Sequence, residues 1–158
     1  MWSLLVADVD DLTPARPPGL LRRLSALLYD VILLFGMLLL AATLVIVPAS
    51  ALSGHEIWIE GWPRLLFQLY LVLVGYGFFA YFWRYGGQTL GMRSWRFRLV
   101  RADGQPLTAA DVRRRLLWST LIPAPLGLFW VPFDRDRLAP HDRLSGTQPR
   151  LLPPKIRG

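Results

Sequence analysis

Residues 20–47 read LLRRLSALLYDVILLFGMLLLAATLVIV, and this stretch decides the fold of the chain. No charged residue occurs between Val31 and Gly54. A helix rises about 1.5 Å per residue and the hydrocarbon core of a bilayer is about 30 Å thick, so a helix of this length can cross it with some tilt. The segment is too long for the core of a signal peptide. It predicts a first membrane-spanning helix, which we expect to end near Pro48.

An acidic residue, Asp30, lies at the mouth of this apolar segment. An Asp at the centre of a membrane helix costs roughly 2.5–3.5 kcal/mol, so Asp30 needs either a stabilising partner or a function. Arg23 precedes it by seven residues, which is close to two helical turns. The two side chains should therefore share one helix face, about 10 Å apart along the axis. We take this pair as the first candidate site.

A second span is predicted by the nineteen residues from Leu65 to Trp83, which carry no charge and lie between Arg64 and Arg84. The last part of this segment, residues 76–83, is rich in aromatic side chains, which are typical of a membrane–water interface. These two segments define the expected class: an all-α membrane protein with two transmembrane helices.

The third apolar segment, Leu116 to Phe133, also carries no charge, but prolines interrupt it. Pro123 and Pro125 cannot continue a regular helix, because proline lacks an amide hydrogen and its ring crowds the preceding turn. Three arrangements stay open: a kinked span, a re-entrant segment or an interfacial one. Irregular backbone at membrane depth is tolerated only where protein or water satisfies its polar groups.

The distribution of arginines predicts the orientation. The loop from Arg84 to Arg115 carries eight Arg and only two Asp, whereas no Lys or Arg occurs between Pro48 and Pro63. By the positive-inside rule the loop and the N-terminus are cytoplasmic. The chain after Phe133 is also basic. We therefore favour a re-entrant or interfacial third segment, which keeps this tail on the cytoplasmic side.

The cytoplasmic loop has its own predicted structure. Residues 95–101, WRFRLVR, largely alternate apolar and basic side chains, and this period of two is typical of a strand. Asp103-Gly104 is a turn signal. We expect a small cytoplasmic β-hairpin between the second and third segments, returning through Pro106-Leu107.

A helix is predicted to follow this hairpin. Thr108 and Asp111 have the spacing of a capping box, with Asp in place of the usual Glu. This helix would carry Arg113, Arg114 and Arg115 to the membrane surface. Anionic phospholipid is the expected partner of this basic run, rather than nucleic acid.

Three blocks of sequence resemble the RDD family of small bacterial membrane proteins, which is named for one arginine and two aspartates. The blocks are GLLRRLSALLYD at 19–30, GQTLG at 87–91 and HDRLSGT at 141–147. The resemblance implies a membrane domain at 19–147, a cytoplasmic N-terminal tail at 1–18 and a basic C-terminal tail at 148–158. It implies the triad Arg23, Asp30 and Asp142. The supporting residues that it implies are Gly87, Gln88, Thr89, Gly91, His141, Gly146 and Thr147.

Two functions stay open for such a protein of the bacterial inner membrane. The resemblance implies a component that transports ions or small solutes; if Asp142 binds Arg23, Asp30 is left to carry a proton or bind a cation. His141 would then titrate near neutral pH. The alternative is a scaffold or accessory subunit whose triad is a structural clamp. Either form would work as a homo-oligomer or with a membrane partner protein.

Other classes of function lack support in the sequence. The chain has no cysteine, so disulfides and thiolate metal sites are excluded. No nucleophile elbow, metal-ligand cluster or phosphate-binding loop is present, so we expect no enzyme activity, no metal and no cofactor. The net charge of +7 fits the positive-inside rule better than nucleic-acid binding.

Overall fold

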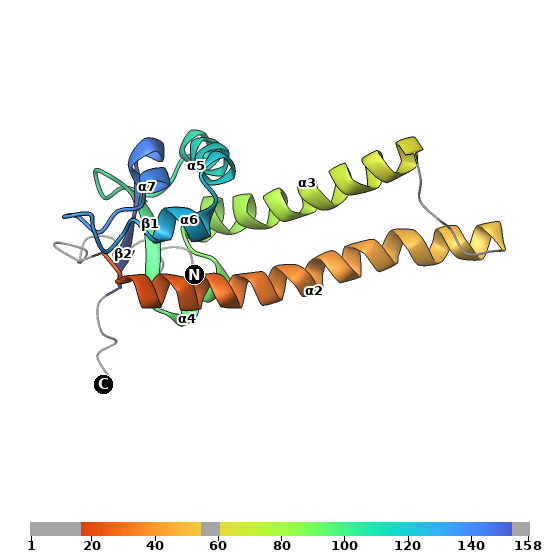
Figure 1. Cartoon of the computed structure of the whole chain (residues 1–158), viewed down its shortest axis with the longest axis horizontal. Helices are drawn as coiled ribbons and strands as arrows, with labels where there is room; N and C mark the ends of the chain where they lie inside the picture. The colour runs from red at the N-terminus through yellow and green to blue at the C-terminus, as the bar shows by residue number, and fades with distance from the viewer. Residues whose placement is uncertain (1–16, 55–60, 153–158) are drawn as a thin grey trace.

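The computed structural model describes residues 17–54 and 61–152, and its two longest helices project from a group of shorter elements (Figure 1). The predicted tails, at 1–18 and 148–158, lie largely outside the described residues. The elements, in chain order, are α2 (Leu20–Ser53), α3 (Gly61–Gly86), α4 (Leu90–Ser94), β1 (Phe97–Arg101), α5 (Ala109–Leu121), α6 (Ala124–Leu128), α7 (Pro140–Ser145) and β2 (Thr147–Leu151).

Helices α2 and α3 are, within the described residues, the ones long and apolar enough to cross a membrane. Their apolar side chains stay largely exposed, as at Ile32 (63 %) and Leu44 (64 %). The expected stop at Pro48 was wrong, because α2 continues through this proline to Ser53. The helix ends where Gly54 adopts a left-handed conformation, with a φ of 69°. Proline removes one backbone hydrogen bond, and a long apolar helix tolerates that loss.

The predicted hairpin was also wrong in its second strand. Strand β1 forms where expected, but it pairs in an antiparallel register with β2, Phe97 opposite Leu151. The turn after β1 does close, since the N–H of Arg101 donates to the carbonyl of Gln105 at 2.9 Å. Pro106 then has no N–H to continue a ladder. Residues 148–151, which we expected to lie in a tail, supply the partner strand instead.

The capping box at the start of α5 is confirmed. The amide of Asp111 donates to the Thr108 hydroxyl at 3.3 Å, and the amide of Thr108 donates to the Asp111 carboxylate at 2.9 Å. The break in the third apolar segment is confirmed as well, because α5 ends at Leu121 and α6 begins only at Ala124. The prolines therefore divide this segment into the end of one helix and a second, short helix.

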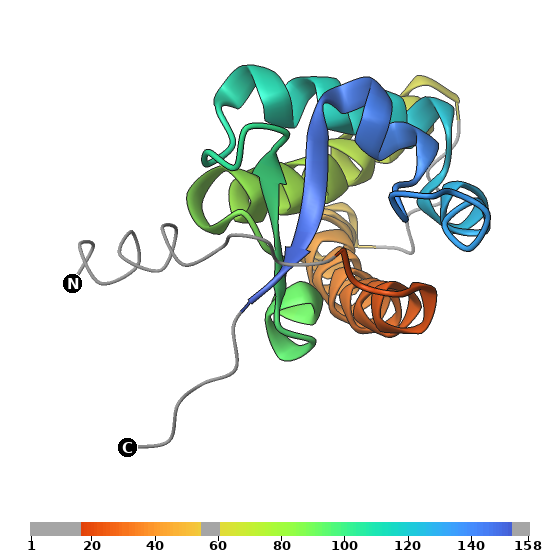
Figure 2. The same cartoon turned by 90° about the vertical axis from the view of Figure 1, so that its left-hand side faces the viewer.

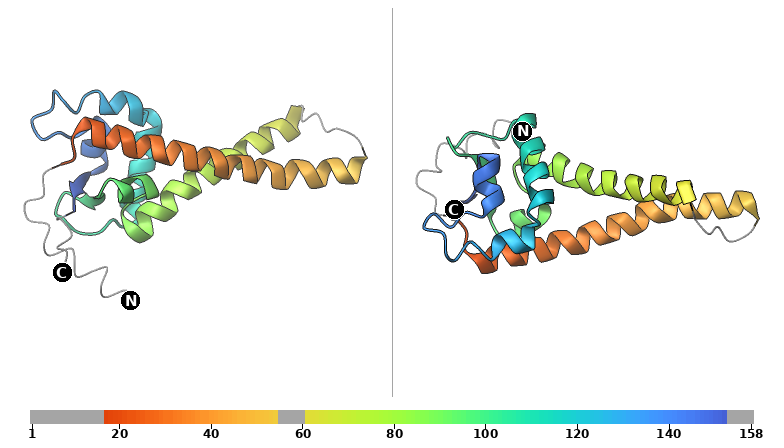
Figure 3. Two further views of the ribbon diagram at one scale, coloured as in Figure 1. Left: turned by 90° about the horizontal axis from the view of Figure 1, so that it is seen from below. Right: turned by 45° about the horizontal axis from the view of Figure 1, so that its top comes forward.

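Two apolar clusters attach the short elements to the long helices. Trp83 of α3 packs with Leu99, Leu107 and Val112, which joins α3 to β1 and α5. Leu128, Val131 and Ala139 pack on the first turns of α2. The sheet consequently lies between α5 and α7 on one side and α2 and α4 on the other (Figure 2). Helix α5 runs across the end of α3, and α6 lies beside α2 (Figure 3).

Candidate functional site

Asp142, in the first turn of α7, is 1 % exposed and binds two arginines from other helices. Arg23 of α2 donates from Nη1 to Oδ2 at 2.7 Å, and Arg115 of α5 donates from Nη2 to Oδ1 at 2.8 Å. The backbone N–H of Ala139 adds a third bond, at 3.0 Å. Burial alone would raise the pKa of Asp142, but the charges of Arg115 and Arg23 outweigh it and lower that pKa. The ionised carboxylate thus joins α2, α5 and α7.

Arg115 is the member of this group that the sequence analysis missed. We expected its side chain at the membrane surface, but it is 5 % exposed, whereas Arg113 and Arg114 are exposed. Its Nη1 donates to the Thr147 hydroxyl at 2.5 Å, and its guanidinium carbon lies 5.2 Å from the centroid of the Trp83 ring. Helical spacing was the available signal, since Arg115 follows the core position 112 by three residues.

Arg23 uses the rest of its guanidinium to bind the backbone just before α2 and just before α7. Its Nε donates to the carbonyl of Pro18 at 3.2 Å, and its Nη2 donates to the carbonyl of Arg137 at 2.7 Å. All three nitrogens of the fork are therefore bonded, and one side chain connects the start of α2 with the segment that leads into α7.

Asp30 turns away from Arg23 and binds the start of α4. The Thr89 hydroxyl donates to its Oδ2 at 2.5 Å and the amide of Gly91 donates to its Oδ1 at 2.9 Å. Within the described residues, no arginine, lysine or histidine lies within ion-pair distance of Asp30. Because Arg23 pairs with Asp142 and not with Asp30, Asp30 is left with neutral donors, although both of its oxygens are bonded.

Gly91 permits this contact because the backbones of α4 and α2 meet there. A Cβ atom at Gly91 would overlap the carbonyl oxygen of Ala26 and would lie 2.9 Å from Cγ of Asp30. Gly87 has a different role: with a φ of 64° it ends α3, and its N–H donates to the carbonyl of Trp83 at 3.2 Å. Gln88 is half-buried, and its amide oxygen has no partner in the described part of the chain.

His141 lies beside Asp142 and is 3 % exposed. Its Nε2 is 3.6 Å from Oδ1 of Asp142, and its ring packs so closely on α6 that a Cβ at Gly127 would lie 2.6 Å from Nδ1. Burial and the charge of Arg115 lower the pKa of His141 to about 4. The expectation that this residue titrates near neutral pH was therefore wrong, because the imidazole is uncharged there.

Gly146 and Thr147, at the end of the same sequence block, connect α7 to β2. Gly146 adopts a φ of 68° and ends α7, and its carbonyl accepts the N–H of Ala102 at 3.1 Å. The Thr147 hydroxyl lies 2.7 Å from that of Ser145 and receives the bond from Arg115. Both residues thus support the ion cluster from the side of the sheet.

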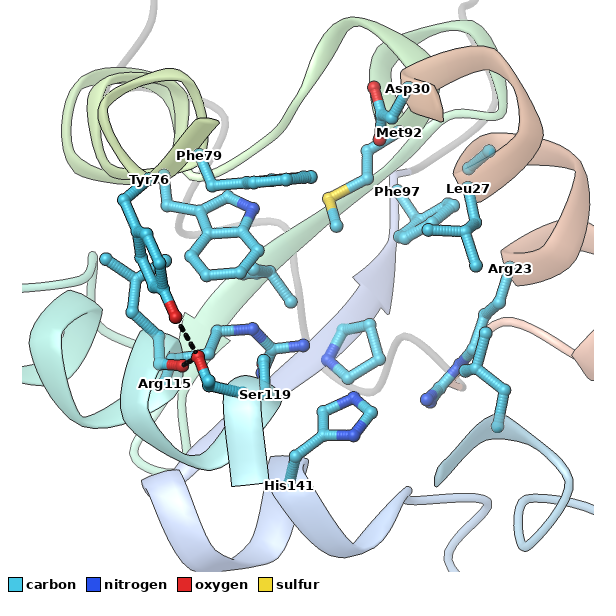
Figure 4. A pocket seen from close by; sticks show the side chains of 17 residues that line it. Arg23, Leu27, Asp30, Tyr76, Phe79, Met92, Phe97, Arg115, Ser119 and His141 are labelled. Atoms are coloured by element: carbon cyan, nitrogen blue, oxygen red, sulfur yellow. Dashed lines mark hydrogen bonds between the residues drawn. The ribbon is translucent and has the colours of Figure 1, made fainter. Parts of the chain in front are cut away.

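A cavity of about 280 Å³ lies between the two carboxylate junctions, bounded by α2, α3 and α5 (Figure 4). Its charged lining comes from Arg23, Asp30 and Arg115, together with the uncharged His141. Most of the remaining lining is apolar: Ala26, Leu27, Phe79, Trp83, Met92, Phe97, Leu99, Leu116, Leu128 and Pro149. A mainly apolar cavity with a few fixed polar groups is the usual form of a small-ligand site. In the described residues, no three metal-ligating side chains gather.

The sequence model of the RDD family matches residues 17–146. The chain belongs to the RDD family. It is also 33 % identical over 78 residues to an uncharacterized protein of Rickettsia prowazekii (strain Madrid E), a match that covers 48 % of the chain and 43 % of that relative. No solved structure matches. Membership of the RDD family and two long apolar helices are consistent with a membrane protein.

Replacing Gly91 by Ala should destabilise the protein. The new methyl group must push α4 off α2, which breaks the Gly91–Asp30 hydrogen bond, and overpacking of this kind costs about 1–3 kcal/mol. Gly77→Ala is the matched control, because nothing lies within 4 Å of a Cβ at that helical glycine. Thermal melting in detergent measures the stability of both variants. Equal melting temperatures for the two would contradict the close approach.

Arg115→Ala should lower the free energy of unfolding by on the order of 3–5 kcal/mol, because it leaves Asp142 buried with half of its compensating charge. Arg115→Lys should recover part of this loss, since an ammonium group cannot reach Asp142 and Thr147 with the geometry of the guanidinium fork. The exposed Arg113, replaced by Ala, should change stability by at most about 0.5 kcal/mol. Denaturant unfolding in detergent compares the three; similar values for Arg113→Ala and Arg115→Ala would rule out the buried ion pair.

His141 should make the protein less stable in mild acid. Below about pH 6.5 the unfolded chain protonates this residue, whereas the folded protein does not until about pH 4, so protons favour unfolding in that window. The contribution of His141 to stability should fall by about 1.4 kcal/mol per pH unit across it. In His141→Gln this part of the slope should vanish, as melting curves from pH 4 to pH 7 would reveal. An unchanged slope in the variant would assign the effect to other groups.

Proposed function

We propose that this RDD-family member is a multi-pass protein of the bacterial inner membrane whose spans are α2 and α3. Two contacts support the topology: Arg23 at the start of α2 binds Asp142, and β1 pairs with β2. The start of α2, the chain after α3 and the C-terminal strand then lie on one side of the membrane. The excess of arginine in these parts makes that side cytoplasmic.

We further propose that the cavity binds an ion or a small solute and that the protein serves as a transport component. The observation that carries this proposal is the position of Asp30, which lines the cavity from inside an apolar helix without a cationic partner in the described residues. An ionisable group within a spanning helix is expensive and marks a functional site by default. Asp30 is the group we expect to exchange a proton or a cation.

A scaffold without transport is the second candidate, and a specific observation favours it. Every carboxylate oxygen of Asp30 and Asp142 already accepts a hydrogen bond from another element of the chain. The triad would then act only as two clamps, one on α4 and one on α7, with anionic phospholipid around the basic surface. Two spans are few to enclose a pathway, so for transport we expect a homo-oligomer or a membrane partner, and a scaffold would itself hold such a partner.

Asp30→Asn should separate the two candidates. The amide oxygen can still accept the N–H of Gly91, and the Thr89 hydroxyl can accept from the amide nitrogen, so the junction with α4 survives while the charge does not. We expect flux of Na⁺, K⁺ or Li⁺ into proteoliposomes, driven by a pH gradient, in the wild type and none in the variant. Melting curves should show that both proteins are folded.

A cavity-filling variant supplies the matched control. Ser119 lines the cavity, whereas Leu117 on the same helix is 57 % exposed. Ser119→Phe should reduce flux strongly and Leu117→Phe should leave it unchanged. Absence of flux in folded wild type for all three cations would remove cation–proton exchange and leave the scaffold as the better candidate.

A further inference from the structure

Six large apolar side chains lie exposed along the end of α5, α6 and the turns that follow, and we call them the 117–133 patch. Their exposed fractions range from 57 % to 82 %. The members are Leu117, Leu121, Leu126, Phe129, Trp130 and Phe133. An exposed apolar surface of this kind marks a contact with a membrane or another protein.

The exposed stripe of α5 changes character along the helix. Arg113, Leu117 and Leu121 follow each other at intervals of four residues, so they share one face, and all three are exposed. The stripe is charged at its start and apolar at its end. After the patch the sequence becomes charged again, with Arg135 and Asp136 exposed. Charged residues thus flank the patch at both ends, which is typical of a segment that inserts partly into lipid.

Much of the backbone of the patch forms hydrogen bonds within the segment. Pro123, Pro125 and Pro132 have no N–H to satisfy. The amides of Ile122, Gly127, Trp130, Val131 and Phe133 all donate to carbonyls three or four residues earlier, at 2.8–3.3 Å. Irregular backbone can enter lipid only when such internal bonds replace those to water, and these five amides meet that condition.

The ends of the patch lie on the same side of the molecule. Arg115, just before it, and Ala139, just after it, both bind Asp142. The segment must therefore leave and return rather than cross. Figure 3 places α5 across the end of α3 and α6 beside α2, at the base of the two long helices. Leu128 and Val131 pack against the first turns of α2, and further apolar side chains of α2, such as Leu28 and Ile32, are 59 % and 63 % exposed.

We infer that the 117–133 patch inserts into the cytoplasmic leaflet and that its partner is the phospholipid layer itself. The aromatic side chains of Phe129 and Trp130 enter the boundary between headgroups and acyl chains, and Arg113 on the same face of α5 as Leu117 lies at headgroup level. This inference rests on the proposed membrane position of α2 and α3. It assigns the third apolar segment to an interfacial element instead of a third span.

Single cysteines test the inference directly, because the natural chain has none. A nitroxide attached at Leu126→Cys or Phe129→Cys, in vesicles of phosphatidylethanolamine and phosphatidylglycerol, should collide several-fold more often with oxygen than with a water-soluble nickel chelate. Nitroxides at Arg113→Cys and Arg135→Cys should show the opposite preference. Leu40→Cys, at a position 61 % exposed in the middle of α2, reports independently on the proposed span.

The outcomes distinguish the inference from the function it rests on. Preference for the nickel chelate at Leu126 and Phe129, with Leu40 in lipid, would overturn the inference alone. Protection from both reagents at the patch would also overturn it, because a protein surface would then cover these residues. Preference for nickel at Leu40 would overturn the proposed membrane position itself. Where Phe129→Cys fails to fold, Phe133→Cys replaces it, since that side chain is 82 % exposed and loses little packing.

Discussion

The carboxylate of Asp142 determines how the short elements are held on the long helices. A buried carboxylate is costly unless charges and hydrogen bonds compensate it, and here Arg23 and Arg115 approach from two different helices. The three helices must therefore meet at one point. The start of α2, the face of α5 and the first turn of α7 are fixed there, and β2 follows directly after α7, opposite β1. The sheet, the cavity and the return of the chain to one side all depend on this junction.

The second junction fixes the other wall of the cavity. Asp30 holds the start of α4 through Thr89 and Gly91, and the absence of a side chain at Gly91 lets the two backbones touch. The cavity lies between these two junctions: Arg23 and Arg115 of the first and Asp30 of the second line it. A clamp and a binding site are thus not exclusive, because the residues that hold the elements together are also the ones that line the space between them.

Local patterns in the sequence predicted the local structure well. Apolar length predicted α2 and α3, Thr108 and Asp111 predicted a helix start, and the prolines predicted a broken third segment. Contacts between residues far apart in the chain were harder to predict. The partner of β1 lies far along the chain, and nothing in the turn after β1 indicates it. Arg115 lies in a run of three arginines, so only its helical spacing indicated that it is buried. The close approach at Gly91 could not be predicted without knowing how α4 packs on α2.

The two aspartates of the triad are held by different kinds of donor, and this difference separates their roles. If Asp142 lost its charge, two buried guanidinium groups would remain without a counter-ion, so its protonation is tied to the loss of the junction. Asp30 is held by a hydroxyl and an amide, which are neutral in either state of the carboxylate. A change of charge at Asp30 alters two hydrogen bonds and leaves no buried cation unpaired in the described residues. Of the two carboxylates, Asp30 is therefore the one that can change its charge while the fold stays intact.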